Sequence, residues 1–118
     1  MNKAVKRSWG EYRVVSDFIH QDAHIKTKII TVSPRRRLSM QRHSNRSEVW
    51  TILQGTAVLE TLHSDQTLSR MIVEENDTVT IREHEWHRLC NETDDSLTVH
   101  EVQYGSECVE SDIERIDV

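Results

Sequence analysis

The stretch Arg37-Leu38-Ser39-Met40-Gln41-Arg42-His43-Ser44-Asn45-Arg46-Ser47-Glu48-Val49-Trp50 indicates both a fold class and a chemistry. In a strand, alternate side chains point to the same face. The face that begins at Arg37 then carries four polar residues: Arg37, Ser39, Gln41 and His43. Such a face suits a site better than a core. A turn at Ser44-Asn45 would return the chain with Glu48 close to His43.

Short runs of β-branched residues recur along the chain, at 28–32, 78–81 and 97–102. Such runs favour pleated, half-buried strands. Turn-forming residues interrupt the sequence roughly every 8–12 residues, which is typical of all-β sandwiches and barrels. We therefore predict a single all-β domain over residues 1–118, with one helical turn at 111–115.

The composition predicts an unusual interior. Hydrophobic residues make up 36% of the 118 residues and charged residues 30%, against about 45–50% and about 25% in average globular domains. Either the core is thin, or the interior carries polar groups for a purpose.

Several function classes are disfavoured. The net charge of −5 argues against nucleic acid as the partner. No run approaches the roughly 18 apolar residues of a membrane span, and residues 1–8 lack the apolar stretch of a secretory signal. Two cysteines are too few for a disulfide framework. We expect a reduced, cytoplasmic protein.

A second histidine follows far downstream, in Trp86-His87-Arg88-Leu89-Cys90-Asn91. Two imidazoles, a carboxylate and an amide oxygen form a suitable ligand set for a divalent metal. The predicted ligands are Gln41, His43, Glu48 and His87. Zinc is the expected ion, with Mn, Co, Ni or Fe as alternatives.

The spacing of these residues resembles that of the cupins. Gln41-x-His43, four residues, Glu48, and then Gly55 after six more resemble the first cupin motif, and His87-x3-Asn91 resembles the end of the second. The same stretch is similar to the segment R-L-S-L-Q-x-H-H-H-R-x-E-x-W of type II mannose-6-phosphate isomerases.

The resemblance to that family extends over residues 7–117. The opening R-P-W-G-x-Y appears as 7–12, and the closing E-V-Q-x-G and E-D-D-I-x-R appear as 101–105 and 110–115. Three departures stand out: Ser44 and Asn45 replace two histidines, Ser8 replaces a proline, and Glu83-His84-Glu85 replaces Pro-x-Gly.

This resemblance implies a double-stranded β-helix, or jelly roll, with the metal in its mouth. It further implies a homodimer that interconverts mannose 6-phosphate and fructose 6-phosphate. Arg37, which matches the family's arginine, is the expected clamp for phosphate or for substrate oxygens.

Other residues are candidates for the same site. Arg46 could hold Glu48 or bind phosphate. Lys26 and Lys28 share a strand face and could line the cavity, although exposure is the ordinary state of lysine. The proton-transferring base could be Glu101 or a metal-bound hydroxide, with Lys28 behind them.

Two other functions remain open at this stage. The loss of two loop histidines and of the Pro-x-Gly turn is consistent with a non-catalytic cupin that binds or senses a sugar or another small anion. A different metal-cupin enzyme, such as an epimerase, a lyase or a dioxygenase, is the third alternative.

Overall fold

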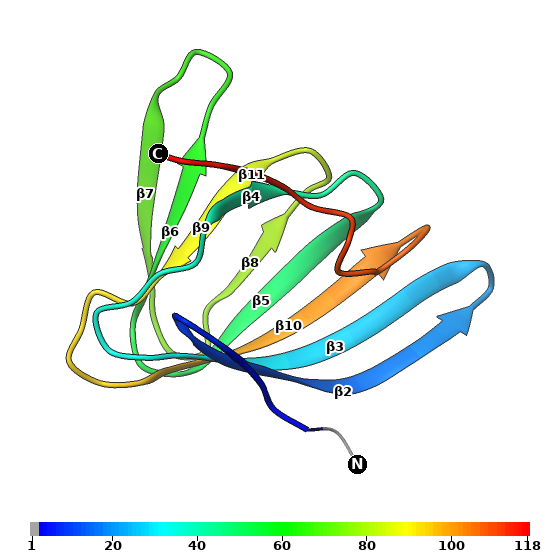
Figure 1. The fold of residues 1–118 in the computed structure, drawn as a ribbon, viewed down its shortest axis with the longest axis horizontal. Helices are drawn as coiled ribbons and strands as arrows, with labels where there is room; N and C mark the ends of the chain where they lie inside the picture. The colour runs from blue at the N-terminus through cyan, green and yellow to red at the C-terminus, as the bar shows by residue number, and fades with distance from the viewer. Residues whose placement is uncertain (1–2) are drawn as a thin grey trace.

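A computed structural model of the chain describes residues 3–118 and contains two antiparallel sheets (Figure 1). The six-stranded sheet has, in spatial order, β1 (Val5–Arg7), β2 (Gly10–His20), β3 (Ala23–Val32), β10 (Leu97–Gly105), β5 (Arg46–Gln54) and β8 (Thr78–Ile81). The five-stranded sheet has β11 (Glu114–Ile116), β4 (Met40–Arg42), β9 (Trp86–Cys90), β6 (Ala57–Leu62) and β7 (Leu68–Val73).

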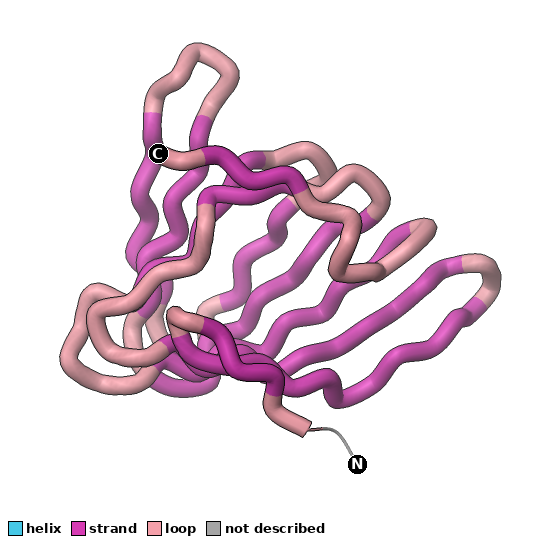
Figure 2. Tube along the Cα trace, viewed as in Figure 1, coloured by secondary structure: helices cyan, strands magenta, loops and turns pink. Residues whose placement is uncertain are grey.

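Strands and loops account for all of residues 3–118, with no helix among them (Figure 2). The predicted all-β class is confirmed, and the predicted runs at 28–32, 78–81 and 97–102 lie within β3, β8 and β10. Within the same residues, no helix has the length and apolarity that crossing a bilayer requires.

The predicted helical turn at 111–115 is wrong. Residues 114–116 form β11, whose backbone pairs with β4 from Met40 to Arg42. The sheet edge offers hydrogen-bond partners that a single isolated helical turn lacks, since helix nucleation is unfavourable. Figure 1 shows this C-terminal segment, in red, running beside β4.

The interior is apolar at one end and polar at the other. Burial alternates regularly along β5 and β10, as expected for strands with one face toward a core. At the apolar end the inward residues include Ile52, Leu97 and Val99. At the other end the inward residues are Arg46, Glu48, Glu101 and Gln103. The low apolar content therefore reflects an interior that carries polar groups.

Candidate functional site

Three side chains meet at the polar end and could hold a metal ion. Ligand atoms of His43, Glu48 and His87 all lie within 4.8 Å of one another, and all three residues are buried. His43 Nε2 is 3.4 Å from Glu48 Oε2, and His87 Nε2 is 3.6 Å from Glu48 Oε1. The loop after β4, strand β5 and strand β9 each contribute one residue, so the predicted turn at Ser44-Asn45 does bring Glu48 to His43.

Both imidazoles are held in one tautomer. His43 Nδ1 is 2.7 Å from the carbonyl oxygen of Asp112, and His87 Nδ1 is 2.7 Å from that of Glu85. A carbonyl only accepts hydrogen bonds, so each Nδ1 carries a proton; in the neutral imidazole that a metal binds, Nε2 then keeps the lone pair. Such a second hydrogen bond orients histidine ligands at metal sites. Two imidazole nitrogens and a carboxylate, aimed at one point, fit a divalent cation.

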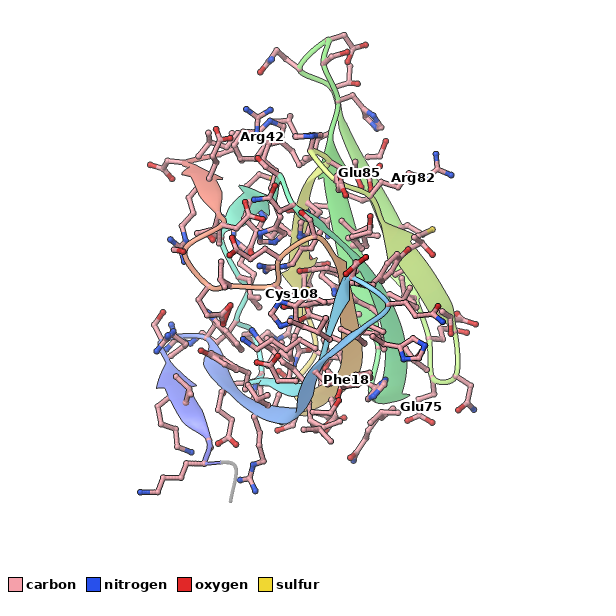
Figure 3. The ribbon with its side chains drawn as sticks, turned by 90° about the vertical axis from the view of Figure 1, so that its right-hand side faces the viewer. Phe18, Arg42, Glu75, Arg82, Glu85 and Cys108 are labelled. Atoms are coloured by element: carbon pink, nitrogen blue, oxygen red, sulfur yellow. The ribbon has the colours of Figure 1, made fainter. Side chains whose placement is uncertain are left out.

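Figure 3 labels Glu85, whose carbonyl oxygen holds His87. Glu85 is near Arg42 and Arg82 at the upper end of the view, whereas Phe18 and Glu75 lie at the lower end. Cys108 lies between these two groups, in the loop that links β10 to β11.

The electrostatics keep Glu48 ionised. Burial alone would raise the pKa of Glu48, but the neighbouring His87, His43 and Arg46 lower this pKa well below its usual range. Burial opposes charge on His87, yet hydrogen bonding to Glu48 raises the pKa of His87 on balance. Burial lowers the pKa of His43. The cluster thus presents a negative oxygen between two imidazole nitrogens.

Arg46 is part of this cluster rather than of an open anion site. Its Nε donates to Glu48 Oε2 at 3.0 Å, its Nη1 donates to Val109 O at 2.9 Å, and its Nη2 lies 3.3 Å from His43 Nε2. Of the two roles considered for Arg46, holding Glu48 is the one that this arrangement provides.

Gln41 lies beside the cluster on β4. It is paired in register with His87, and its Nε2 donates to the backbone and side-chain oxygens of Ser39 at 3.3 and 3.2 Å. Its role as a fourth ligand stays a prediction.

A cavity of about 490 Å³ opens onto this cluster. Its walls include Glu48 and His87 as well as Arg37, Lys28 and Glu101, which were predicted from the sequence, whereas Lys26 does not line it. The guanidinium of Arg37 makes no hydrogen bond or ion pair with any residue in 3–118, so it is free to meet an anion. Arg37, Ser39 and Gln41, which were expected to share a face, all line the cavity, and Leu38 and Met40 line it as well. Within residues 37–43, regular strand is confined to β4, from Met40 to Arg42.

Lys28 is engaged on the cavity wall. Its Nζ donates to Glu110 Oε1 at 2.5 Å and lies 4.2 Å from the centre of the Tyr12 ring. Although burial works against it, the Lys28 charge lowers the pKa of Glu110 on balance. Glu110 and Tyr12 were not predicted as site residues.

Glu101 is buried on the same wall with two donors. Trp50 Nε1 donates to Glu101 Oε2 at 3.0 Å, and Gln103 Nε2 donates to Glu101 Oε1 at 2.7 Å. Burial, helped by the charge of Glu48, raises the pKa of Glu101 to about 7. A carboxyl group with such a pKa can exchange protons near neutral pH.

Asp112 holds the loop that contains Ser44 and Asn45, the two residues that stand in place of histidines in the resemblance described above. Its carboxylate accepts hydrogen bonds from the backbone N–H groups of Ser44 and Asn45, both at 2.9 Å. The side chains of Ser44 and Asn45 are exposed. Neither substitution therefore removes one of the three clustered ligands. Asp112 was missed because its partners are backbone groups 67–68 residues away. Only the family's closing motif could have marked it.

The match to a protein family covers the whole chain: the family described as "Mannose-6-phosphate isomerase C-terminal" matches residues 1–118. The chain belongs to this family. It is 37% identical over 113 residues to alginate biosynthesis protein AlgA of Pseudomonas aeruginosa, covering 96% of this chain and 22% of AlgA. It is 33% identical over 117 residues to mannose-1-phosphate guanylyltransferase ManC of Salmonella typhimurium, covering 99% of this chain and 22% of ManC. The chain thus spans about a fifth of the length of these relatives.

Solved structures confirm the cupin fold. Oxalate decarboxylase from Bacillus subtilis superposes with a TM-score of 0.81 at 12% identity, over 98% of this chain and 30% of that one. Capsular polysaccharide assembling protein CapF from Staphylococcus aureus gives a TM-score of 0.79 at 15% identity, over 100% of this chain and 35% of that one. At such identities the likeness is one of fold.

Proposed function

We propose that this protein is a metal-dependent isomerase that interconverts mannose 6-phosphate and fructose 6-phosphate in the cavity. One observation carries the proposal: His43, Glu48 and His87 converge, with both Nε2 atoms turned toward Glu48, on a cavity that also holds a buried carboxyl group and a free guanidinium. Membership of the mannose-6-phosphate isomerase family supports the choice of substrate.

The chemistry requires a base and an environment that accepts negative charge. Aldose–ketose isomerisation removes the proton from carbon 2 of the aldose and returns it to carbon 1, while a hydroxyl proton moves between the two oxygens. A divalent ion supplies stabilisation of the charge that develops on those oxygens. Residues His43, Glu48 and His87, with Gln41 as the predicted fourth ligand, would hold it.

The remaining roles fall to residues on the cavity wall. Glu101, which is buried and held by Trp50 and Gln103, would take the proton as a carboxylate and return it. Arg37 would offer its guanidinium to the phosphate, and Lys28, on β3, lines the same cavity. Water has limited access to Glu101, which is 5% exposed.

A coupled assay of fructose 6-phosphate conversion tests the proposal. Protein stripped of metal and reloaded with Zn, Co or Mn is compared with His43→Ala and His87→Ala, and with His20→Ala, an exposed histidine, as the control. We expect turnover that needs metal and both buried histidines. A folded, metal-loaded protein without turnover would overturn the isomerase proposal.

The arrangement of Arg46 favours a second candidate, a non-catalytic cupin that binds a sugar or a small anion. A guanidinium already lies 3.3 Å from His43 Nε2 and supplies positive charge beside Glu48 without a metal. Calorimetry with mannose 6-phosphate separates the two functions, because a binder shows affinity without turnover.

A further inference from the structure

Gln103 holds a buried acceptor that the proposed chemistry leaves unused. The residue is 1% exposed and lines the cavity. Its Oε1 has no hydrogen-bond partner among residues 3–118. Every other buried side-chain nitrogen or oxygen atom of these residues has one. Leaving a buried acceptor unpaired is costly, so such an atom points to a missing donor.

The orientation of the Gln103 amide follows from its neighbour. Its Nε2 lies 2.7 Å from Glu101 Oε1, and the other oxygen of Glu101 already accepts from Trp50. When Glu101 is ionised, as its proposed role as the base requires, an amide oxygen at that distance would face a carboxylate oxygen with no hydrogen between them. The nitrogen must therefore face Glu101, and the oxygen must point away from it.

The unpaired oxygen belongs to the wall beside the candidate metal ligands. Gln103 and Glu48 are partners in the register of β10 and β5, and such partners carry their side chains on the same face of a sheet. The nearby cations are engaged: Lys28 donates to Glu110, and Arg46 donates to Glu48 and Val109. The donor therefore comes from a molecule in the cavity: water in the free protein, and a ligand in the complex.

We propose that Gln103 Oε1 accepts a hydrogen bond from a hydroxyl group of the ligand, so that Gln103 positions a sugar and selects it over a carboxylate. With Glu101 ionised, Glu101 and Gln103 Oε1 present only acceptors to this part of the cavity. A hydroxyl can donate to such a wall, whereas a carboxylate ligand would be repelled by it. The inference rests on the proposed function, because it takes a sugar phosphate as the ligand.

The test measures binding of mannitol 6-phosphate, an open-chain analogue that cannot isomerise, by calorimetry on zinc-loaded protein. Gln103→Met keeps the length of the side chain but removes both polar atoms. We expect affinity for mannitol 6-phosphate to fall about tenfold, with zinc content and affinity for inorganic phosphate unchanged. Gln54→Met, the same substitution at an exposed glutamine, controls for the change itself.

A double cycle separates positioning of the ligand from support of the fold. Analogues that lack the hydroxyl at carbon 1, 2 or 3 are measured against both proteins. One analogue will lack the hydroxyl group that Gln103 binds. For this analogue, Gln103→Met should cause no further loss of affinity, because the interaction is already absent in the wild type. Gln103→Asn, which withdraws the amide by one methylene, gives the same comparison should the Met variant not fold.

The outcomes distinguish this inference from the proposed reaction. Equal losses for every analogue and for inorganic phosphate would overturn the role of Gln103. Normal mannitol 6-phosphate binding by Gln103→Met, in a protein that isomerises, would overturn it while the reaction stands. A wild type that binds without turnover, and loses binding in Gln103→Met, would overturn the reaction and keep the inference. If the wild type binds none of these ligands, the role of Gln103 is overturned. The isomerase proposal is then tested separately by the turnover assay.

Discussion

Arg46 donates from Nε to Oε2 of Glu48 at 3.0 Å, and both side chains are at least 95% buried. The two residues are adjacent inward positions of β5. A buried ion pair brings little net stability, but removing one partner strands the other charge away from water. Arg46 therefore keeps the carboxylate of Glu48 charged and in place for the imidazoles around it.

Replacing Arg46 should destabilise the metal-free protein. We expect Arg46→Met to lower the free energy of unfolding by about 3 kcal/mol, since Glu48 is left buried with less counter-charge. Urea denaturation in the presence of EDTA measures this. Arg42→Met is the matched control: its partner Glu114 is 56% exposed, and exposed pairs contribute at most about 1 kcal/mol. Equal losses in the two variants would contradict the assigned role.

Asp112 should matter for both stability and metal binding. Asp112→Ala removes the acceptor of two backbone N–H groups, and we expect a loss of about 2 kcal/mol. The loop it anchors carries His43, so affinity for zinc should fall about 10- to 100-fold. Calorimetric titration with zinc measures the second effect. Asp94→Ala, at an 83% exposed carboxylate, should leave both quantities unchanged.

The contribution of Asp112 has a defined pH range. Burial alone would raise its pKa, but the N–H groups of Ser44 and Asn45 lower the pKa below the usual 3.8 on balance. Its stabilisation is therefore fully present above about pH 4 and is lost as the pH falls through the folded-state pKa. The gap in unfolding free energy between wild type and Asp112→Ala should shrink between pH 5 and pH 2. A gap that stayed constant would show that the carboxylate charge is not involved.

The parts of the site that could be predicted from the sequence are those formed by side chains close together along the chain. His43 and Glu48 are five residues apart, and a turn at 44–45 is enough to bring them together. His87 was predicted as a second histidine far downstream, and its resemblance to the end of the second cupin motif supported that choice. Alternation placed Lys26 and Lys28 on one face, yet only Lys28 lines the cavity, because position along the strand decides this as well as the face.

Contacts made by the backbone could not be predicted. The carbonyl oxygens of Asp112 and Glu85 fix the tautomers of the two histidines, and every residue type has such an oxygen. The segment 111–115 illustrates the same limit. Its composition is compatible with a helical turn, but pairing with β4 overrides that preference. Long-range partners, rather than local propensity, determine its conformation.

Glu101 should make the unfolding free energy fall as the pH rises, which is opposite in sign to the effect of Asp112. Burial, together with Glu48, raises its folded-state pKa to about 7, above the ordinary 4.5. Between these values the unfolded chain loses the proton while the folded protein keeps it, so the unfolding free energy falls as the pH rises and levels off above pH 7. Glu101→Gln cannot titrate. In EDTA, its unfolding free energy relative to wild type should therefore rise from pH 4.5 to pH 7. A flat difference would contradict the raised pKa.

Gly105 connects the end of β10 to the loop of the candidate metal centre. A Cβ atom on Gly105 would lie 2.1 Å from the backbone oxygen of Asn45 and 2.8 Å from Cα of Arg46. Real contacts of this kind are never so short, so Gly105→Ala must push away the segment that follows His43. We expect a loss of zinc affinity larger than that of Asp112→Ala, because the displacement moves the Arg46 backbone as well as the loop.

Ser106→Ala is the control for Gly105→Ala. The Ser106 side chain makes only a 3.5 Å contact with the same Asn45 oxygen, while its backbone N–H keeps a 3.0 Å hydrogen bond to it. Removing the hydroxyl leaves that backbone bond intact, so zinc affinity should stay as in the wild type. If Gly105→Ala also bound zinc normally, the loop would have to tolerate a shift of its backbone. The three ligand atoms would then be held by the loop after β4, by β5 and by β9, without help from the end of β10.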